Sequence, residues 1–202
     1  TVRGIDLGLS TNSTNAEENR YTATCGGVHA FSSTGFTLSQ SSGNVPCHNA
    51  TGNSMVAWTW NAGTSTDPNN TAGSITSSVR ANQTAGFSIV TWSVGNAVNN
   101  STIGHGLGAA PSMIICKTRN ASNQNWIVYH KALGTGDYLA LESTQGNDTR
   151  FSTIWGTSAP TSTVFGVAET GYSNNSSNNN YVAYCFAPVA GYSAFGSYTG
   201  NG

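Results

Sequence analysis

The chain has 202 residues, of which eight are acidic and seven basic, so its net charge is −1 at pH 7. Charged residues make up 7% of the sequence, against about a quarter in an average soluble domain, and no cluster of Lys and Arg exists to bind nucleic-acid phosphates. No apolar run approaches the roughly 18 residues that a membrane span needs. Neither nucleic acid nor membrane insertion is therefore expected.

The composition indicates an all-β protein. The chain holds 24 glycines and 10% aromatic residues, and Ser, Thr and Asn separate short β-branched and aromatic runs. Such runs favour strands, whereas Gly, Asn and Ser favour turns. No stretch repeats Leu, Glu and Lys with the period of an amphipathic helix. The sequence predicts an all-β fold, an antiparallel β-sandwich.

In chain order, residues 1–63 combine polar loops with aromatic runs, among them "MVAWTW" (55–60). Trp58 and Trp60 are two residues apart and share one face of a strand, so both are expected in a core or an interface. The polar segment 64–85 is expected to be a connector, with one short strand at 75–79. The following strands are predicted at 87–92, 112–117, 126–129, 138–141, 164–167 and 181–186, with a shorter one at 154–156.

The four cysteines fall into two pairs. Cys25 and Cys47 lie in loops rich in Gly, Pro and Asn and form our candidate disulfide. Cys116 and Cys185 lie inside predicted strands, where a buried free thiol is the common state. A bridge between these two requires neighbouring strands and stays open. No pair has the CxxC spacing of a zinc site.

Internal similarity is the most informative feature of the sequence. Aromatic and Arg positions recur in the compared segments, with Phe36 matching Phe165 and "VAW" at 56–58 matching "VAY" at 182–184. The matched segments are 4–20 with 134–150, 29–40 with 159–170, 53–63 with 179–191, and 85–97 with 190–202.

These matches predict a repeated sandwich. Residues 86–189 form one complete repeat, and residues 1–63 are the back portion of a preceding repeat, joined to it by the 64–85 linker. Residues 190–202 are the first strand of a following repeat, which leaves its aromatic residues in need of cover. Because the chain opens with "TVRG" and lacks an initial Met, we expect it to be processed or cut from something longer.

The motifs "GHGLGAAP" (104–111), "WIVYH" (126–130) and "VAYCFAPVAGYSAFG" (182–196) occur in this order. Together they resemble a repeated domain of virion and tail-appendage proteins of tailed phages, especially phages of marine bacteria. The resemblance covers essentially the whole chain. It implies a concanavalin-like or laminin-G-like β-sandwich, of jelly-roll type, in a virion component without a defined enzyme activity. Cys25 and Cys47 depart from the family pattern.

Candidate catalytic residues do not form a recognisable site in the sequence. His105 has no acid or nucleophile close to it in a motif, so a structural histidine that donates to a loop carbonyl is favoured. His130 is expected to end a strand. A glycoside hydrolase needs two converging carboxylates, but Glu17 and Glu18 are consecutive and point apart. The sequence predicts no enzyme and no catalytic residue.

No cofactor is predicted, and calcium is the open alternative, because oxygen-rich loops can hold a hard cation. Asp137, Glu142, Asn147 and Asp148 lie on one segment, and Asp6 with Glu17 occupies the same places in the preceding repeat. Ordinary loop hydrogen bonds or surface ion pairs, Asp148 with Arg150 or Asp137 with Lys131, explain these residues equally well.

Five tryptophans could offer an aromatic platform for a sugar. Trp92 and Trp126 fall in predicted strands and are expected in the core. Trp155 stands between turn residues in "IWGTSAP" and is expected to be exposed, which makes it the candidate glycan-contact residue.

The sequence therefore predicts a structural, adhesive virion protein of a tailed phage, a tail-fibre or appendage segment located in the virion or extracellular space. Its expected partners are other copies of itself, as a homo-oligomer, other virion proteins, and a host-surface glycan. A carbohydrate-binding module of a secreted or surface protein is one alternative. The other is a self-assembling extracellular filament that is completed by strand addition.

Overall fold

The computed structural model describes residues 7–19, 27–39, 52, 54–96, 99–149, 153–168 and 176–201. Every regular element in these ranges is a β-strand, so the all-β prediction is confirmed. None of the described ranges contains a helix that is long and apolar enough to cross a membrane. The chain divides into two compact units, one built mainly from Glu17–Trp60 and the other from Asn61–Gly202 together with Thr11–Ala16.

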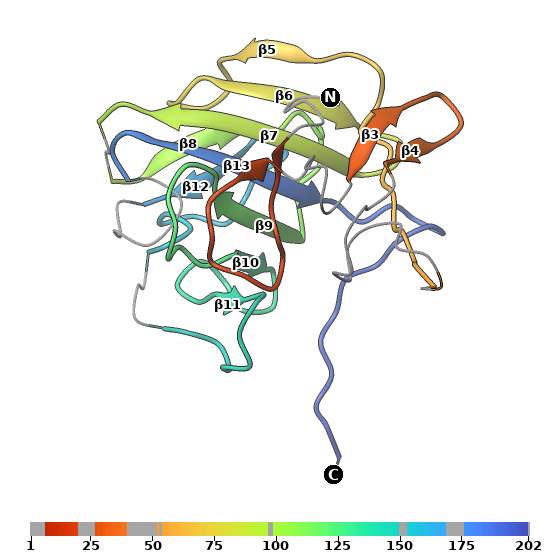
Figure 1. Ribbon diagram of the computed structural model, residues 1–202. Helices are drawn as coiled ribbons and strands as arrows, with labels where there is room; N and C mark the ends of the chain where they lie inside the picture. The colour runs from red at the N-terminus through yellow and green to blue at the C-terminus, as the bar shows by residue number, and fades with distance from the viewer. Residues whose placement is uncertain are drawn as a thin grey trace. The chain divides into compact units, whose positions relative to one another are not determined.

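The larger unit contains a seven-stranded antiparallel sheet (Figure 1). Its strand order is β11-β10-β9-β13-β7-β6-β5. The strands are β5 (Asp67–Asn70), β6 (Ser77–Asn82), β7 (Phe87–Val94), β9 (Met113–Thr118), β10 (Ile127–His130), β11 (Leu139–Ala140) and β13 (Asn179–Phe186).

Strand β13 lies at the centre of this sheet. All eight of its residues pair with β7, from Asn179 opposite Val94 to Phe186 opposite Phe87, and its other edge pairs with β9. Val182 and Ala183 have no exposed surface. A central strand is covered on both faces and bonded on both edges, and the apolar run "YVAYCF" fits that position.

A second, smaller layer packs against one face of the sheet. It consists of β8 (Ser101–Gly104) and β12 (Val164–Val167), which pair antiparallel. Phe165 of β12 lies edge-on to Trp92 of β7, with the ring centroids 5.8 Å apart, and both belong to one buried cluster with Ile103. Two antiparallel layers around one apolar core form a β-sandwich.

The segment 64–85, predicted as a connector with one short strand at 75–79, contains two strands, and β6 overlaps the predicted one. It supplies β5 and β6, and β6 pairs along its whole length with β7. Ser77 and Val79 are buried whereas Ser78 and Arg80 are half-buried, so the strand alternates with a period of two. The predicted strand at 75–79 thus corresponds to the start of β6, whose buried positions include Ser77.

The smaller unit contains two short antiparallel pairs, β1 (Leu7–Gly8) with β2 (Glu18–Asn19) and β3 (Val28–Phe31) with β4 (Phe36–Leu38). Gly8 pairs with Glu18, and in the larger unit Tyr138 pairs with Asp148. Each of the matched segments 4–20 and 134–150 therefore contains an antiparallel pair.

The residues after β13 do not form the predicted strand. The isolated bridge between Val189 and Ser193 closes a turn, and residues 194–201 have no regular secondary structure. They run away from the sheet as an extended tail (Figure 1). Tyr198 in this tail is 94% exposed.

Candidate functional site: two exposed strand-like segments

The prediction that Trp155 is exposed is wrong. Its side chain has no exposed surface and packs edge-on against Tyr129, with the ring centroids 5.7 Å apart. Residues 153–155 form a turn and Gly156 adopts a φ of 77°, a left-handed conformation that lets the chain reverse behind a buried indole. Trp155 therefore cannot contact a glycan at the surface.

The other tryptophans separate into buried and exposed pairs. Trp92 and Trp126 are buried, as predicted, and Trp126 stacks on Tyr184 at 6.4 Å between ring centroids. Trp58 and Trp60 are instead exposed, so the core alternative does not hold for them in this chain. The interface alternative stays a prediction.

His105 lies within hydrogen-bonding distance of a loop carbonyl, as the sequence favoured. Its imidazole is buried, Nδ1 accepts the Leu107 backbone N–H at 3.2 Å, and Nε2 lies 3.1 Å from the Thr161 carbonyl oxygen. Because Nδ1 accepts, the proton sits on Nε2, which donates to Thr161. Burial lowers the pKa of His105, only partly offset by this hydrogen bond, so the neutral imidazole ties two loops together.

His130 ends β10, as predicted, and its Nδ1 accepts the Ala132 N–H at 3.2 Å. It therefore helps to form the turn that follows the strand.

The candidate calcium ligands each take part in separate hydrogen bonds. Asp137 accepts from the Asn147 side chain at 3.1 Å, Asp148 accepts from the Tyr138 hydroxyl at 3.1 Å, and Glu142 accepts from the Trp126 backbone N–H at 3.0 Å. Within the described residues no three acidic, His or Cys side chains gather as a metal site would require. Asp6 and Arg150 lie outside those residues.

Cys116 and Cys185 are free, buried thiols on neighbouring strands. Burial raises the pKa of Cys185 to about 12 and raises the pKa of Cys116 as well. Both thiols are therefore protonated and poor nucleophiles at neutral pH. The candidate disulfide between Cys25 and Cys47 lies outside the described residues.

The sequence analysis missed a buried lysine. Lys117 on β9 has no exposed surface, and its Nζ donates to the carbonyl oxygens of Thr14 at 3.3 Å and Thr118 at 3.2 Å. Burial lowers the pKa of Lys117, and the Glu142 carboxylate opposes that shift. Its position inside the apolar run "MIICKT" was the available signal. The contacts give it a structural role, the fixing of residues 11–16 against the sheet.

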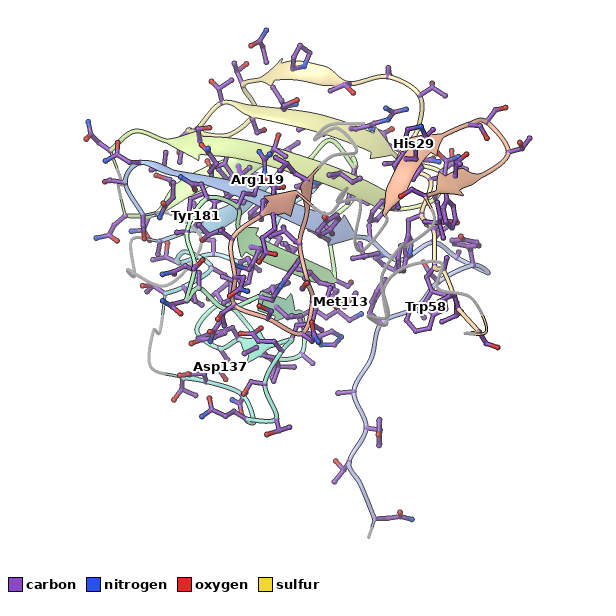
Figure 2. The ribbon with its side chains drawn as sticks, viewed as in Figure 1. His29, Trp58, Met113, Arg119, Asp137 and Tyr181 are labelled. Atoms are coloured by element: carbon purple, nitrogen blue, oxygen red, sulfur yellow. The ribbon has the colours of Figure 1, made fainter. Side chains whose placement is uncertain are left out.

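An exposed apolar segment covers residues 54–60. It has no regular secondary structure, yet Val56 is 80% exposed and Trp58, labelled in Figure 2, is 78% exposed. Met55 and Trp60 are exposed as well. Soluble proteins rarely expose several large apolar side chains together, and such a patch marks an interaction site.

This segment has the sequence pattern of the central strand. Val56-Ala57-Trp58 matches Val182-Ala183-Tyr184 of β13. In β13 these positions are paired on both edges, whereas no hydrogen bond joins residues 54–59 to any described residue. Residues 54–60 thus have a β13-like sequence but do not form a strand.

The tail has the pattern of the neighbouring strand. "GYSAFGSYTG" (191–200) matches "GFSIVTWSVG" (86–95), which contains β7. Tyr192 and Tyr198 are exposed, and Phe195 is half-buried, 6.4 Å from the Phe186 ring between centroids. An unpaired strand-like backbone with apolar side chains can bind another strand through ladder hydrogen bonds. Residues 54–60 of the smaller unit and residues 192–198 of the larger unit are thus two separate candidate interaction segments.

A family model described as a domain of unknown function (DUF7483) matches residues 1–202. No curated protein and no solved structure matches the chain.

Proposed function

The chain belongs to the DUF7483 family, and we propose that it is a structural, adhesive protein of a tailed-phage virion that assembles through its β-sandwich. A tail fibre or a similar appendage is the setting that the motif resemblance favours. The observation that carries the proposal is the exposed segment 54–60, whose apolar side chains repeat the pattern of a buried central strand.

Exposure of this segment favours association. A Val or Met side chain gains about 1.5–3 kcal/mol when it leaves water completely, and an aromatic side chain buries about 150–250 Å². Val56 and Trp58, which are 80% and 78% exposed, therefore provide a driving force for association. A partner surface that covers them would capture it.

The two candidate segments would make contacts between uncharged surfaces. Residues 54–60 and 191–200 contain no Asp, Glu, Lys or Arg. Contacts between uncharged surfaces are not screened by salt. Assembly is therefore expected to depend on concentration and to change little with ionic strength.

The shared pairing in the two matched segments supports a repeated organisation. Gly8 pairs with Glu18 in one segment and Tyr138 with Asp148 in the other, so both contain an antiparallel pair. Repeated units that each present incomplete strands suit an extended appendage, because every unit then contacts its neighbours.

Sedimentation velocity over a range of protein concentrations tests this function. We expect oligomers that grow with concentration and that persist in about 0.5 M NaCl, where the Debye length falls below about 5 Å. Trp58→Ser should weaken association. Leu141→Ser is the matched control, since Leu141 is exposed but lies outside the candidate site. A monomer at every concentration contradicts the proposal.

The exposed Trp58 also favours a second candidate function, that of a carbohydrate-binding module. An indole that is 78% exposed can stack on the apolar face of a sugar ring. A glycan array with wild type and Trp58→Ala tests it, because glycan binding that Trp58→Ala abolishes supports this function. If wild type binds no glycan, the second candidate is wrong.

A further inference from the structure

The two exposed segments resemble strands that pair with each other in this same structure. Residues 54–60 match β13, residues 192–198 match β7, and β13 and β7 form an eight-residue antiparallel ladder. The exposed segments therefore carry the two complementary halves of a pairing whose register is known.

We infer that residues 54–60 of one copy pair antiparallel with residues 192–198 of a second copy, in the register of β13 with β7. This inference rests on the proposed function, because it specifies how the chain assembles. The partner must supply a β7-like strand, and the tail of a second copy supplies one.

The template fixes which residues lie opposite each other. Phe186 pairs with Phe87, Val182 with Thr91 and Ala183 with Val90. Transferred through the sequence matches, these pairs place Trp60 opposite Tyr192, Val56 opposite Gly196 and Ala57 opposite Phe195.

The side chains that meet in this register are complementary in size. Trp58 falls opposite Ala194, and Phe195 falls opposite Ala57, so a large residue meets a small one at both positions. Trp60 and Tyr192 reproduce the aromatic pair Phe186–Phe87, whose ring centroids are 5.0 Å apart. Cross-strand pairs of this kind stabilise a sheet.

Most of the backbone of both segments makes no hydrogen bond to other described residues. No hydrogen bond joins residues 54–59 or 194–201 to other described residues. The N–H groups of Tyr192 and Ser193 bond to the Val189 carbonyl, so the new ladder starts at Ala194, and Tyr192 joins through its ring. Neither segment carries a charge that would oppose the approach.

This contact joins residues 54–60 of one copy to the C-terminal tail of the next. Because the two surfaces differ, the interface is heterologous, and repeated addition produces an open filament or a closed ring. Each contact places a β7-like tail strand beside residues 54–60, which have no regular secondary structure in the single chain.

Cysteine crosslinking between two single variants tests the pairing and its register. Val56→Cys and Gly196→Cys suit the test, since Val56 is 80% exposed and a Cβ at Gly196 meets no atom within 4 Å. The two variants are purified separately, mixed and oxidised with copper–phenanthroline. We expect a disulfide-linked heterodimer, which only contact between copies can form.

The register control is Ala57→Cys mixed with Gly196→Cys. A one-residue slip places the two Cβ atoms on opposite faces of a sheet, so this mixture should crosslink about tenfold less, the factor that corresponds to 1.4 kcal/mol. Equal crosslinking in both mixtures overturns the register. Wild type that self-associates while neither mixture crosslinks above a wild-type control overturns the inference but leaves the proposed function standing. A Val56→Cys/Gly196→Cys double variant that yields only an internal disulfide also overturns it.

A proline pair provides a second measurement. Adjacent N–H groups of a strand point to opposite edges, so Gly196→Pro/Ser197→Pro must remove one donor from the new ladder. We expect self-association to fall at least about tenfold while thermal unfolding is unchanged, because this tail is not part of the sheet. Gly200→Pro/Asn201→Pro lies beyond the paired residues and should have no effect. Equal association of both proline variants overturns the inference.

Discussion

Replacement of Trp155 by Phe separates two opposing contributions to the stability of the core. The indole Nε1–H is buried and finds no acceptor among the described residues, and an unpaired buried donor costs about 1–3 kcal/mol. Phe removes that donor but loses part of the ring that packs against Tyr129. Truncation of a whole Trp to Ala costs about 3–5 kcal/mol, so the smaller change to Phe is expected to cost roughly 1–2 kcal/mol in packing.

The two contributions nearly cancel for Trp155→Phe. We expect its free energy of unfolding to lie within about 1 kcal/mol of wild type, whereas Trp155→Ala should lose about 3–5 kcal/mol. Urea unfolding followed by circular dichroism measures both. Trp92→Phe repeats the test at a second position, since the Trp92 indole is also buried without an acceptor among the described residues. If Trp155→Phe destabilises as much as Trp155→Ala, the indole N–H is satisfied and the reasoning is refuted.

Two further predictions concern the fold. A Cβ at Gly166 would collide with the Trp155 backbone oxygen, so Gly166→Ala should lower the free energy of unfolding by at least about 2 kcal/mol. A Cβ at Gly146 has no atom within 4 Å, so Gly146→Ala should change the free energy of unfolding little. Equal effects of the two substitutions in urea unfolding would contradict this prediction. Burial lowers the pKa of His105 from 6.5, so His105 binds a proton less readily in the folded state than in the unfolded state. The neutral imidazole therefore contributes stability above pH 6.5, and this contribution is lost as the pH falls through the folded-state pKa. Tm measured from about pH 7 to 5 should therefore fall less steeply for His105→Gln than for wild type, and identical slopes would exclude this role.

Local patterns located most strands of the larger unit. The predicted runs 87–92, 112–117, 126–129, 164–167 and 181–186 correspond to β7, β9, β10, β12 and β13. Each carries β-branched or aromatic residues bounded by turn residues, a signal that is read within one segment. β8 was missed because "STIG" is short and polar, and its position depends on β12, about sixty residues later.

Burial of single residues was harder to predict than strand type. Trp155 is buried because the turn at 153–155 reverses toward Tyr129, and nothing near Trp155 in the sequence shows that contact. For His105, the predicted hydrogen bond to a loop carbonyl is present, with Thr161 as the partner. Burial of Trp155 was harder to predict because it depends on partners that are distant in sequence.

Residues 54–60 and β13 show how the burial of similar sequences depends on pairing with neighbouring strands. The same triplet pattern gives a Val182 without exposed surface between two strands and a Val56 that is 80% exposed without them. Burial of each large side chain returns about 1.5–3 kcal/mol, whereas ordering each residue of an extended segment costs about 1–2 kcal/mol. These quantities are of similar size, so a single strand pairing yields only a modest net gain. Assembly by this contact should therefore be reversible, and it becomes stable where many identical contacts act along one appendage.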